Sequence, residues 1–292
     1  MTALLGMLAF GVAVPALTAT AIVASVLMGG RRLEGTMRSG VAVTLGLGLG
    51  ELAGHAGVSW PSWPPSDVTD RIPYLVLAAM LAALVEVIGS AAAWGKAGIA
   101  WGNRTLLTVV TLAAMLGPIY GETWTTPNML LGGALIGAGM VLAWANLDAV
   151  TSRVSGPPVF LPLLLLLTGA SVVLVLSGSV VLGRLAGVLT AALAGCWVVS
   201  WWTPIIDFKR GGRPILVVAL GSLLLNGHFY AEVPRGSVVL LAMAPATLAL
   251  LNLGPVARRP SWVHALIATT VMAVPVAVAV GLAVAAMPSY EY

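Results

Sequence analysis

Long apolar runs follow one another along almost the whole chain, with only short polar stretches between them. A membrane-spanning helix needs about 20 mostly apolar residues. Ten segments meet this requirement: residues 4–28, 39–58, 73–94, 104–121, 128–147, 158–178, 183–202, 214–230, 236–253 and 262–287. We therefore predict an all-α, polytopic bundle of about ten transmembrane helices, forming a single integral membrane domain over residues 1–292.

The composition argues against a water-soluble fold. Hydrophobic residues make up 59% of the chain and charged residues only 8%, whereas a soluble globular protein carries about 25% charged residues. So few charges cannot cover a water-exposed surface, and the lipid bilayer is the expected partner. The net charge of +4 is spread over short loops without a basic patch, so the sequence predicts no nucleic-acid binding.

The positions of the basic residues predict an orientation, because cytoplasmic loops of membrane proteins collect Lys and Arg. With both termini outside the cytoplasm, three basic residues fall in outside loops, Arg71, Arg184 and Arg235. The other eleven fall in inside loops: Arg31, Arg32, Arg38, Lys96, Arg104, Arg153, Lys209, Arg210, Arg213, Arg258 and Arg259. A miscounted helix would invert this bias downstream, so the unbroken pattern supports ten helices with both termini extracytoplasmic.

The first apolar segment has no basic residue before its core. A secretory signal peptide needs such a basic region, so we expect this segment to be retained as a transmembrane helix. The lack of a targeting signal and of features for glycosylated loops favours a bacterial cytoplasmic membrane.

Two distant segments end in the same pattern, Gly-x-x-Tyr-small-Glu. The first runs from Gly117 through Tyr120 to Glu122, and the second from Gly227 through Tyr230 to Glu232. The chain holds only five tyrosines, so the coincidence suggests an internal repeat with units 71–148 and 184–254.

The residues around these endings extend the match. Arg104 precedes Tyr120 by 16 residues, and Arg213 precedes Tyr230 by 17. The predicted helices three to five would then repeat as helices seven to nine. Since the offset is an even number of helices, both units would point the same way, which makes the repeat parallel rather than inverted. The alternative is that apolar helices resemble one another and Arg marks their inside ends.

Glu86 is the clearest charged residue within an apolar segment. A charge in the hydrocarbon core costs about 2.5–3.5 kcal/mol on insertion scales, so its presence needs a reason. Glu86 lies thirteen residues into the third segment, roughly 20 Å from its outer end at 1.5 Å per residue. It is either a protonatable or cation-binding carboxylate facing a cavity, or a hydrogen-bonded glutamate that fixes helix packing.

Glu51 and His55 stand four residues apart on the second segment, so they share one helix face. A carboxylate and an imidazole one turn apart could relay protons or hold a substrate. The alternative is a satisfied polar contact between helices. Two ligands are too few for a zinc site, which needs three or four, so no metal is predicted here.

The two Tyr-small-Glu pairs, Tyr120 with Glu122 and Tyr230 with Glu232, are expected at the outer surface near the axis of the proposed repeat. They could line a pseudo-symmetric outer vestibule. Alternatively, they are interfacial tyrosines and Glu–Arg pairs that cap the helices, since exposed ion pairs are common and weak.

The motifs of common enzymes are missing from the sequence. It contains no Walker A loop, HExxH, GxSxG or GxGxxG. The single cysteine, Cys196, excludes a disulfide within the chain and a cysteine-based metal cluster. We therefore expect no cofactor and no catalytic residues, and an intramembrane enzyme is disfavoured.

Two functions remain. The first is a small-solute transporter or permease, with a proton or small molecule bound near Glu51, His55 and Glu86. It predicts a water-accessible polar cavity. The second is a non-catalytic subunit or scaffold that assembles with membrane protein partners. It predicts a dry core and a large lateral interface.

Overall fold

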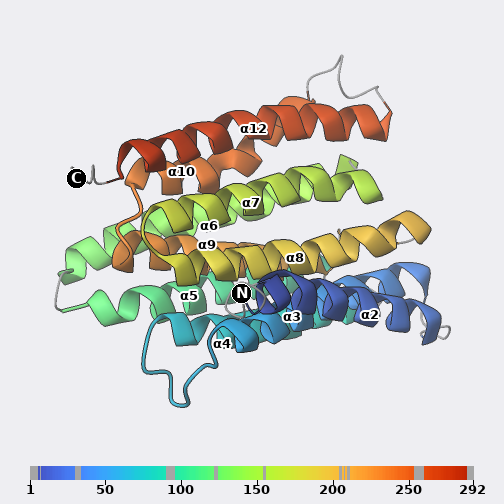
Figure 1. Ribbon diagram of the computed structural model, residues 1–292, viewed down its shortest axis with the longest axis horizontal. Coiled ribbons are helices and arrows are strands. Elements are labelled where there is room, and N and C mark those ends of the chain that lie inside the picture. Colours follow the sequence, from blue (N-terminus) through green and yellow to red (C-terminus); the bar gives the residue numbers. More distant parts are fainter. Residues whose placement is uncertain are drawn as a thin grey trace.

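The computed structural model describes residues 6, 8–29, 34–89, 96–121, 124–153, 156–203, 206, 208, 211–252 and 260–287. Helices account for nearly all of these residues (Figure 1). In chain order they are η1 (Ala9–Ala13), α2 (Val14–Gly29), α3 (Gly35–Val58), η2 (Thr69–Arg71), α4 (Ile72–Gly89), α5 (Lys96–Leu116), η3 (Gly117–Ile119), α6 (Thr126–Arg153), η4 (Pro157–Val159), α7 (Phe160–Leu176), α8 (Val180–Trp202), α9 (Gly212–Tyr230), α10 (Arg235–Met243), η6 (Ala244–Asn252) and α12 (Ser261–Ala285).

Each of the ten apolar segments predicted from the sequence coincides with a helix. Eight helical stretches in the described part of the chain are long and apolar enough to cross a membrane. The other two segments lie on α5, whose first half carries Asn103 and Arg104, and on α10, a shorter apolar helix that gives way to the 3-10 helix η6 next to Pro245. Proline lacks the N–H that an α-helix needs, which explains this change. The count of ten spans and their orientation stay predictions.

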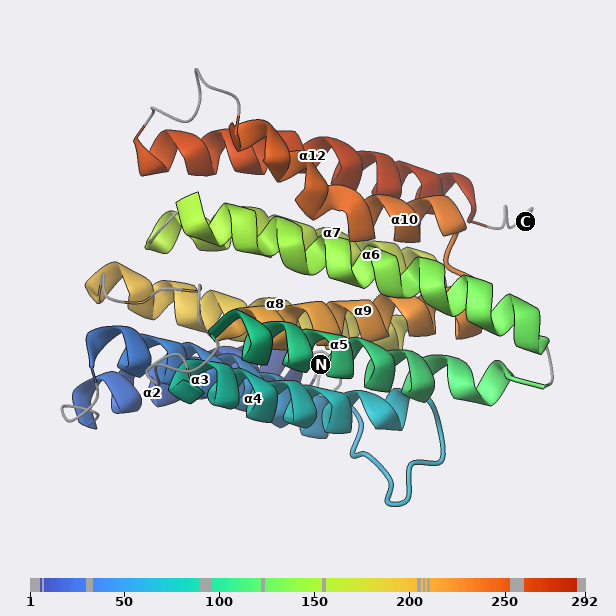
Figure 2. The ribbon, with the colours of Figure 1, turned by 180° about the vertical axis from the view of Figure 1, so that it is seen from behind.

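The helices lie with their long axes nearly aligned, as both views show (Figures 1 and 2). α10 and α12 form one edge of the bundle, and α2, α3 and α4 form the opposite edge. α7, α8 and α9 lie between them. The loop from residue 59 to residue 68, drawn as a cyan coil, projects beyond the helices in both figures.

The parallel course of α5 and α9 defines the two ends of the bundle. At one end, Arg104 of α5 and Arg213 of α9 contact the same residue, Asp148. At the other end, the Tyr230 hydroxyl of α9 donates to the Met115 carbonyl of α5 over 3.0 Å. We call these the basic end (Arg104, Asp148, Arg213) and the tyrosine end.

Small residues let α3 lie very close to α2 and α8. A Cβ atom placed on Gly50 would stand 2.9 Å from the Pro15 carbonyl oxygen and 3.0 Å from the Ala192 Cβ. Gly46 and Gly54 face similar crowding, by Val23 and Val188 respectively. Close approach through small residues is a common way for helices to pack within membranes.

The surroundings of the two proposed repeat units differ. In the proposed repeat, α4 corresponds to α8 and α5 corresponds to α9. A symmetric pair of units would therefore pack α5 against α8 in the way that α4 packs against α9. α4 does pack along α9, but α5 and α8 make no comparable contact among the described residues. The backbones of the two matching endings differ too. The left-handed residue is Gly121 in the first (φ 84°) and Glu232 in the second (φ 54°). The parallel course of α5 and α9 agrees with the predicted direction, but the repeat itself stays a prediction.

Candidate functional site

Glu51 and His55 lie on the face of α3 that turns toward α9 and α4. Thr44, Gly48, Glu51 and His55 follow the i, i+4, i+7, i+11 spacing of a single helix face. The neighbours of Thr44 and Gly48 show which helices this face of α3 contacts. A Cβ on Gly211, just before α9, would meet the Thr44 hydroxyl, and one on Gly48 would meet side chains of α4 and α9.

Both side chains are buried without a hydrogen-bond partner. The exposed fraction is 0% for Glu51 and 1% for His55. Neither carboxyl oxygen of Glu51 and neither ring nitrogen of His55 has a partner within the described part of the chain. The described part of the protein therefore does not contain the satisfied polar contact that was the alternative from the sequence. An unpaired charge at such depth costs several kcal/mol, so the carboxyl group needs a proton, a cation or water as its partner.

A polar cavity opens at the tyrosine end; His55 does not line it, but Ser59, one helical turn later, does. Its volume is about 450 Å³. Its lining includes Ser59, Asp67, Thr69, Asp70, Asn226 and Tyr230. The Asn226 side-chain amide donates to the Thr69 hydroxyl over 3.1 Å, which ties α9 to η2 across this cavity. Asp70 in the cavity wall interacts electrostatically with His55. His55 thus lies between the cavity and the more deeply placed Glu51.

α9 continues the polar lining into the bundle. Ser222 lies one turn before Asn226, so the two share a face. Its hydroxyl is fully buried and has no partner among the described residues. Since buried polar groups normally find partners, Glu51, His55 and Ser222 together mark a place where water or a ligand would be bound.

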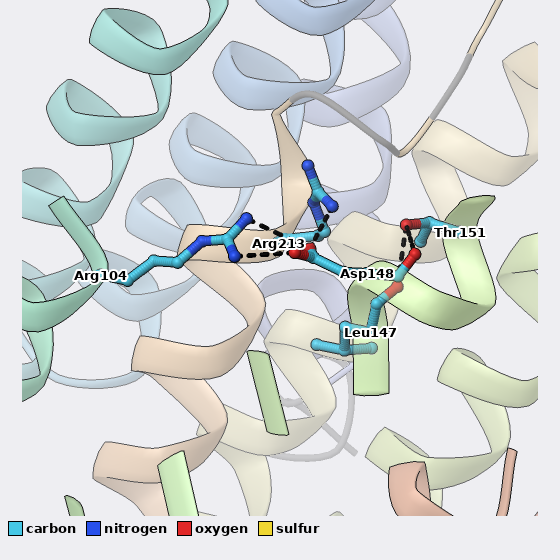
Figure 3. Close-up of polar contacts among 5 residues, drawn as sticks. All are labelled: Arg104, Leu147, Asp148, Thr151 and Arg213. Carbon is cyan, nitrogen blue, oxygen red and sulfur yellow. Dashed lines mark hydrogen bonds and ion pairs between the residues drawn. The ribbon is translucent and has the colours of Figure 1, made fainter. Parts of the chain in front are cut away.

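The basic end holds a different kind of cluster (Figure 3). The Arg104 guanidinium donates two hydrogen bonds to the Asp148 carboxylate, over 2.7 and 3.2 Å, and Arg213 donates a further one. Arg104 also stacks against two aromatic rings, with its guanidinium carbon 5.0 Å from the Trp101 ring centre and 5.5 Å from that of Trp144. The cluster therefore joins α5, α6 and α9 at this end.

Glu86 belongs to this basic-end cluster and not to the site around Glu51. It interacts electrostatically with Arg104, Arg213 and Asp148. Gly48 of α3 lies opposite Met80 of α4. These two residues therefore mark the same height along the bundle. Because α3 and α4 run in opposite directions, Glu51 lies beyond Gly48 toward the tyrosine end and Glu86 lies beyond Met80 toward the basic end. At 1.5 Å per residue, the two glutamates are roughly 14 Å apart along the bundle axis. The structure thus keeps Glu51 with His55 and separates Glu86 from both.

The described residues of the expected outer vestibule differ in their contacts, and the vestibule itself stays a prediction. Tyr230 lines the polar cavity. The Tyr120 hydroxyl instead pairs with that of Thr126 over 3.2 Å. Glu232 is exposed, and Glu122 lies outside the described residues.

Tyr230 has a structural role as well. Its hydroxyl and the Arg71 guanidinium donate to the carbonyls of Met115 and Ala114, over 3.0 and 2.7 Å. These carbonyls lie in the last turn of α5, where backbone acceptors lack partners within the helix. Tyr230 and Arg71 thus cap the end of α5, whereas the alternative from the sequence assigned capping to Glu–Arg pairs.

Sequence reasoning missed Asp148, Asp70 and Asn226. A signal for Asp148 was available, because it directly follows the fifth apolar segment and has no basic neighbour to pair with in sequence. Its partners, Arg104 and Arg213, lie on other helices and are 44 and 65 residues away in sequence. In the part of the chain that the structure describes, no group of three or more His, Cys, Asp or Glu side chains could hold a metal ion.

The fold and composition are those of a polytopic helical membrane protein. Comparisons with models of protein families, with curated protein sequences and with solved structures gave no match for this chain. Its function therefore has to be argued from the geometry of its own polar groups.

Proposed function

We propose that this protein is a small-solute transporter or permease in which Glu51 is the protonatable or cation-binding group. The observation that carries the proposal is the burial of Glu51 and His55 without hydrogen-bond partners, next to a polar cavity at one end of the bundle. Intramembrane carboxylates and imidazoles of this kind are typical of proton and ion pathways.

The two ends of the bundle support a mechanism of alternating access. The tyrosine end has a polar cavity that reaches toward His55. The basic end is held together by the ion pairs of Asp148 with Arg104 and Arg213. In this arrangement Glu51 receives a proton or cation from the tyrosine end by way of His55. Release toward the basic end then requires the cluster around Asp148 to open.

The substrate is a proton, or a small solute moved together with one. Following the bias of its basic residues, the basic end faces the cytoplasm and the cavity faces outward, and the membrane is the bacterial cytoplasmic membrane. These assignments rest on the loop charges and not on the arrangement of the helices.

A second function, a non-catalytic subunit or scaffold, is favoured by one observation. Gly46, Gly50 and Gly54 pack α3 against α2 and α8 with no space for a Cβ atom. Such a tight interface resists the helix movements that transport needs. In a scaffold, Glu51 and His55 would be sealed from water and protons.

Labelling of Glu51 by dicyclohexylcarbodiimide distinguishes the two functions, because this apolar reagent modifies protonated carboxyl groups within membranes. In native membranes we expect an adduct on the peptide that contains Glu51, with a yield that falls as the pH rises. Glu51→Gln should abolish this adduct, and Glu86→Gln should leave it unchanged. A Glu51 that resists the reagent at every pH would exclude the transporter and leave the scaffold.

Transport itself is tested in proteoliposomes that contain a pH-sensitive dye. An imposed potential should drive proton entry through the wild-type protein, either alone or after addition of a solute from a screening panel. Glu51→Gln should reduce this entry to the rate of protein-free vesicles. Equal rates for wild type and Glu51→Gln under all solutes would contradict the proposal.

A further inference from the structure

A second, apolar crevice runs between α6, α9 and α10, away from the Glu51 site. Its volume is about 410 Å³, within the range of pockets that bind small molecules. α6 and α10 lie beside each other across it, as seen in Figure 2. Its walls are almost wholly aliphatic, with Ile136 and Met140 from α6, Leu220 and Leu224 from α9, and Val238 from α10 as examples.

The crevice opens sideways, toward the lipid. Leu135, Val239 and Met243 line it and are themselves exposed, with 66%, 58% and 39% of their surface accessible. Exposed aliphatic side chains in the middle of these helices face hydrocarbon in a membrane protein. A molecule that enters this crevice therefore comes from the bilayer and not from water.

The crevice is longer than the hydrocarbon of one lipid leaflet. Its α9 wall extends from Leu216 to Phe229, about 20 Å at 1.5 Å per residue. The hydrocarbon of one leaflet is roughly 15 Å thick, half of a 30 Å core. The crevice is therefore long enough to hold a single extended acyl chain from the interface to the bilayer centre.

The polar groups of the crevice are basic and gather at its tyrosine end. Arg235 and His228 are its ionisable lining residues. Arg235 is the first residue of α10, and the first turn of this helix has no acidic residue. The positive end of the α10 dipole adds to the attraction for an anion. Glu232 lies three residues earlier in the sequence and does not line the crevice.

From this combination we infer that the crevice binds one acyl chain of an anionic lipid from the leaflet at the tyrosine end. The headgroup lies beside Arg235 and His228, and the chain extends along α9 between α6 and α10. This site shares no residue with the pair Glu51 and His55, so the inference does not depend on the proposed transport function.

Photocrosslinking tests the site. The probe is phosphatidylglycerol with a diazirine in one acyl chain, added to the full-length protein in phosphatidylcholine nanodiscs. We expect adducts on α6, α9 and α10 peptides. Gly139 lines the crevice and has nothing within 4 Å of its Cβ position, so Gly139→Leu adds side-chain volume to the crevice and should lower the yield roughly tenfold.

Gly133 provides a matched control. It lies on the same helix, also has open space around its Cβ position and does not line the crevice, so Gly133→Leu should leave the yield unchanged. Equal yields for Gly139→Leu and wild type, adducts spread evenly over α2, α4 and α12, or crosslinks to a second protein chain in place of lipid would each overturn the inference.

The role of charge is tested by a phosphatidylcholine probe with the same diazirine chain. Wild type should favour the phosphatidylglycerol probe severalfold. Arg235→Gln should remove this preference, and Arg235→Lys should keep it, because a simple positive charge is enough to attract the headgroup. A preference that survives in Arg235→Gln would show that Arg235 does not select the lipid.

Discussion

Arg104 and Asp148, 44 residues apart in sequence, form a two-bond ion pair that joins α5 to α6 at the basic end of the bundle. The Arg104 side chain is 6% exposed and that of Asp148 33%. Arg213 adds a third helix, α9, to the same carboxylate. Because Asp148 forms ion pairs with two largely buried arginines from different helices, the stability of this end depends on it.

Replacement of Asp148 by Asn should therefore destabilise the protein. It removes the carboxylate charge that pairs with both Arg104 and Arg213, and loss of one partner from a buried ion pair is destabilising. Since Asp148 keeps partial contact with solvent, we expect a loss on the order of 2 kcal/mol in the free energy of unfolding. Denaturation in detergent micelles measures it, with Asp148→Glu as the variant that keeps the charge. Equal stability of Asp148→Asn and wild type would contradict the assigned role.

The glycine contacts of α3 lead to a second prediction. Gly50→Ala would place a methyl group 2.9 Å from the Pro15 carbonyl oxygen, and overpacking of this kind costs about 1–3 kcal/mol. Gly133→Ala is the control, because nothing lies within 4 Å of its Cβ position. It should be neutral or slightly stabilising, since Ala is the better helix former. Melting temperatures in the same detergent compare the two, and an unchanged melting temperature for Gly50→Ala would refute the close packing.

The contact between Tyr230 and Met115 can be tested through the end of α5. Tyr230→Phe removes the hydroxyl that donates to the Met115 carbonyl, which should cost about 1 kcal/mol. The amides in the last turn of α5 should also exchange hydrogen faster. Tyr120→Phe removes only an exposed contact with Thr126 and should have a smaller effect. If the two variants behave alike in hydrogen exchange, Tyr230 does not cap α5.

Orientation in the membrane can be tested with single added cysteines. The native Cys196 is buried, so it should remain unreactive in the folded protein. Ser66 in the loop at the tyrosine end and Gly98 at the basic end are both exposed. With an impermeant maleimide applied to intact cells, Ser66→Cys should react and Gly98→Cys should react only after lysis. The reverse result would invert the predicted topology.

The positions of the helices could be predicted from the sequence, because the length and continuity of an apolar run are local properties. The ten segments from residues 4–28 to 262–287 each correspond to a helix. The shared face of Glu51 and His55 also follows from spacing alone, since both lie on one helix. The glycine-rich second segment, residues 39–58, is one of the more buried helices because its glycines admit close neighbours.

What the sequence could not supply is which polar groups meet across helices. Glu51 and Glu86 were grouped because both lie in apolar segments, but their depths depend on how α3 and α4 run past each other. Likewise, Asp148 acquires its role only when α5, α6 and α9 come together.

The sequence by itself thus determined a helical membrane protein with its segments and its internal helix faces. The tertiary structure decided that Glu51 and His55 lie near a polar cavity while Glu86 lies with the arginines at the other end. The physical reason is that apolar length and helical period are set by neighbouring residues. Contacts between helices, in contrast, are set by the fit of side chains that are far apart in the chain.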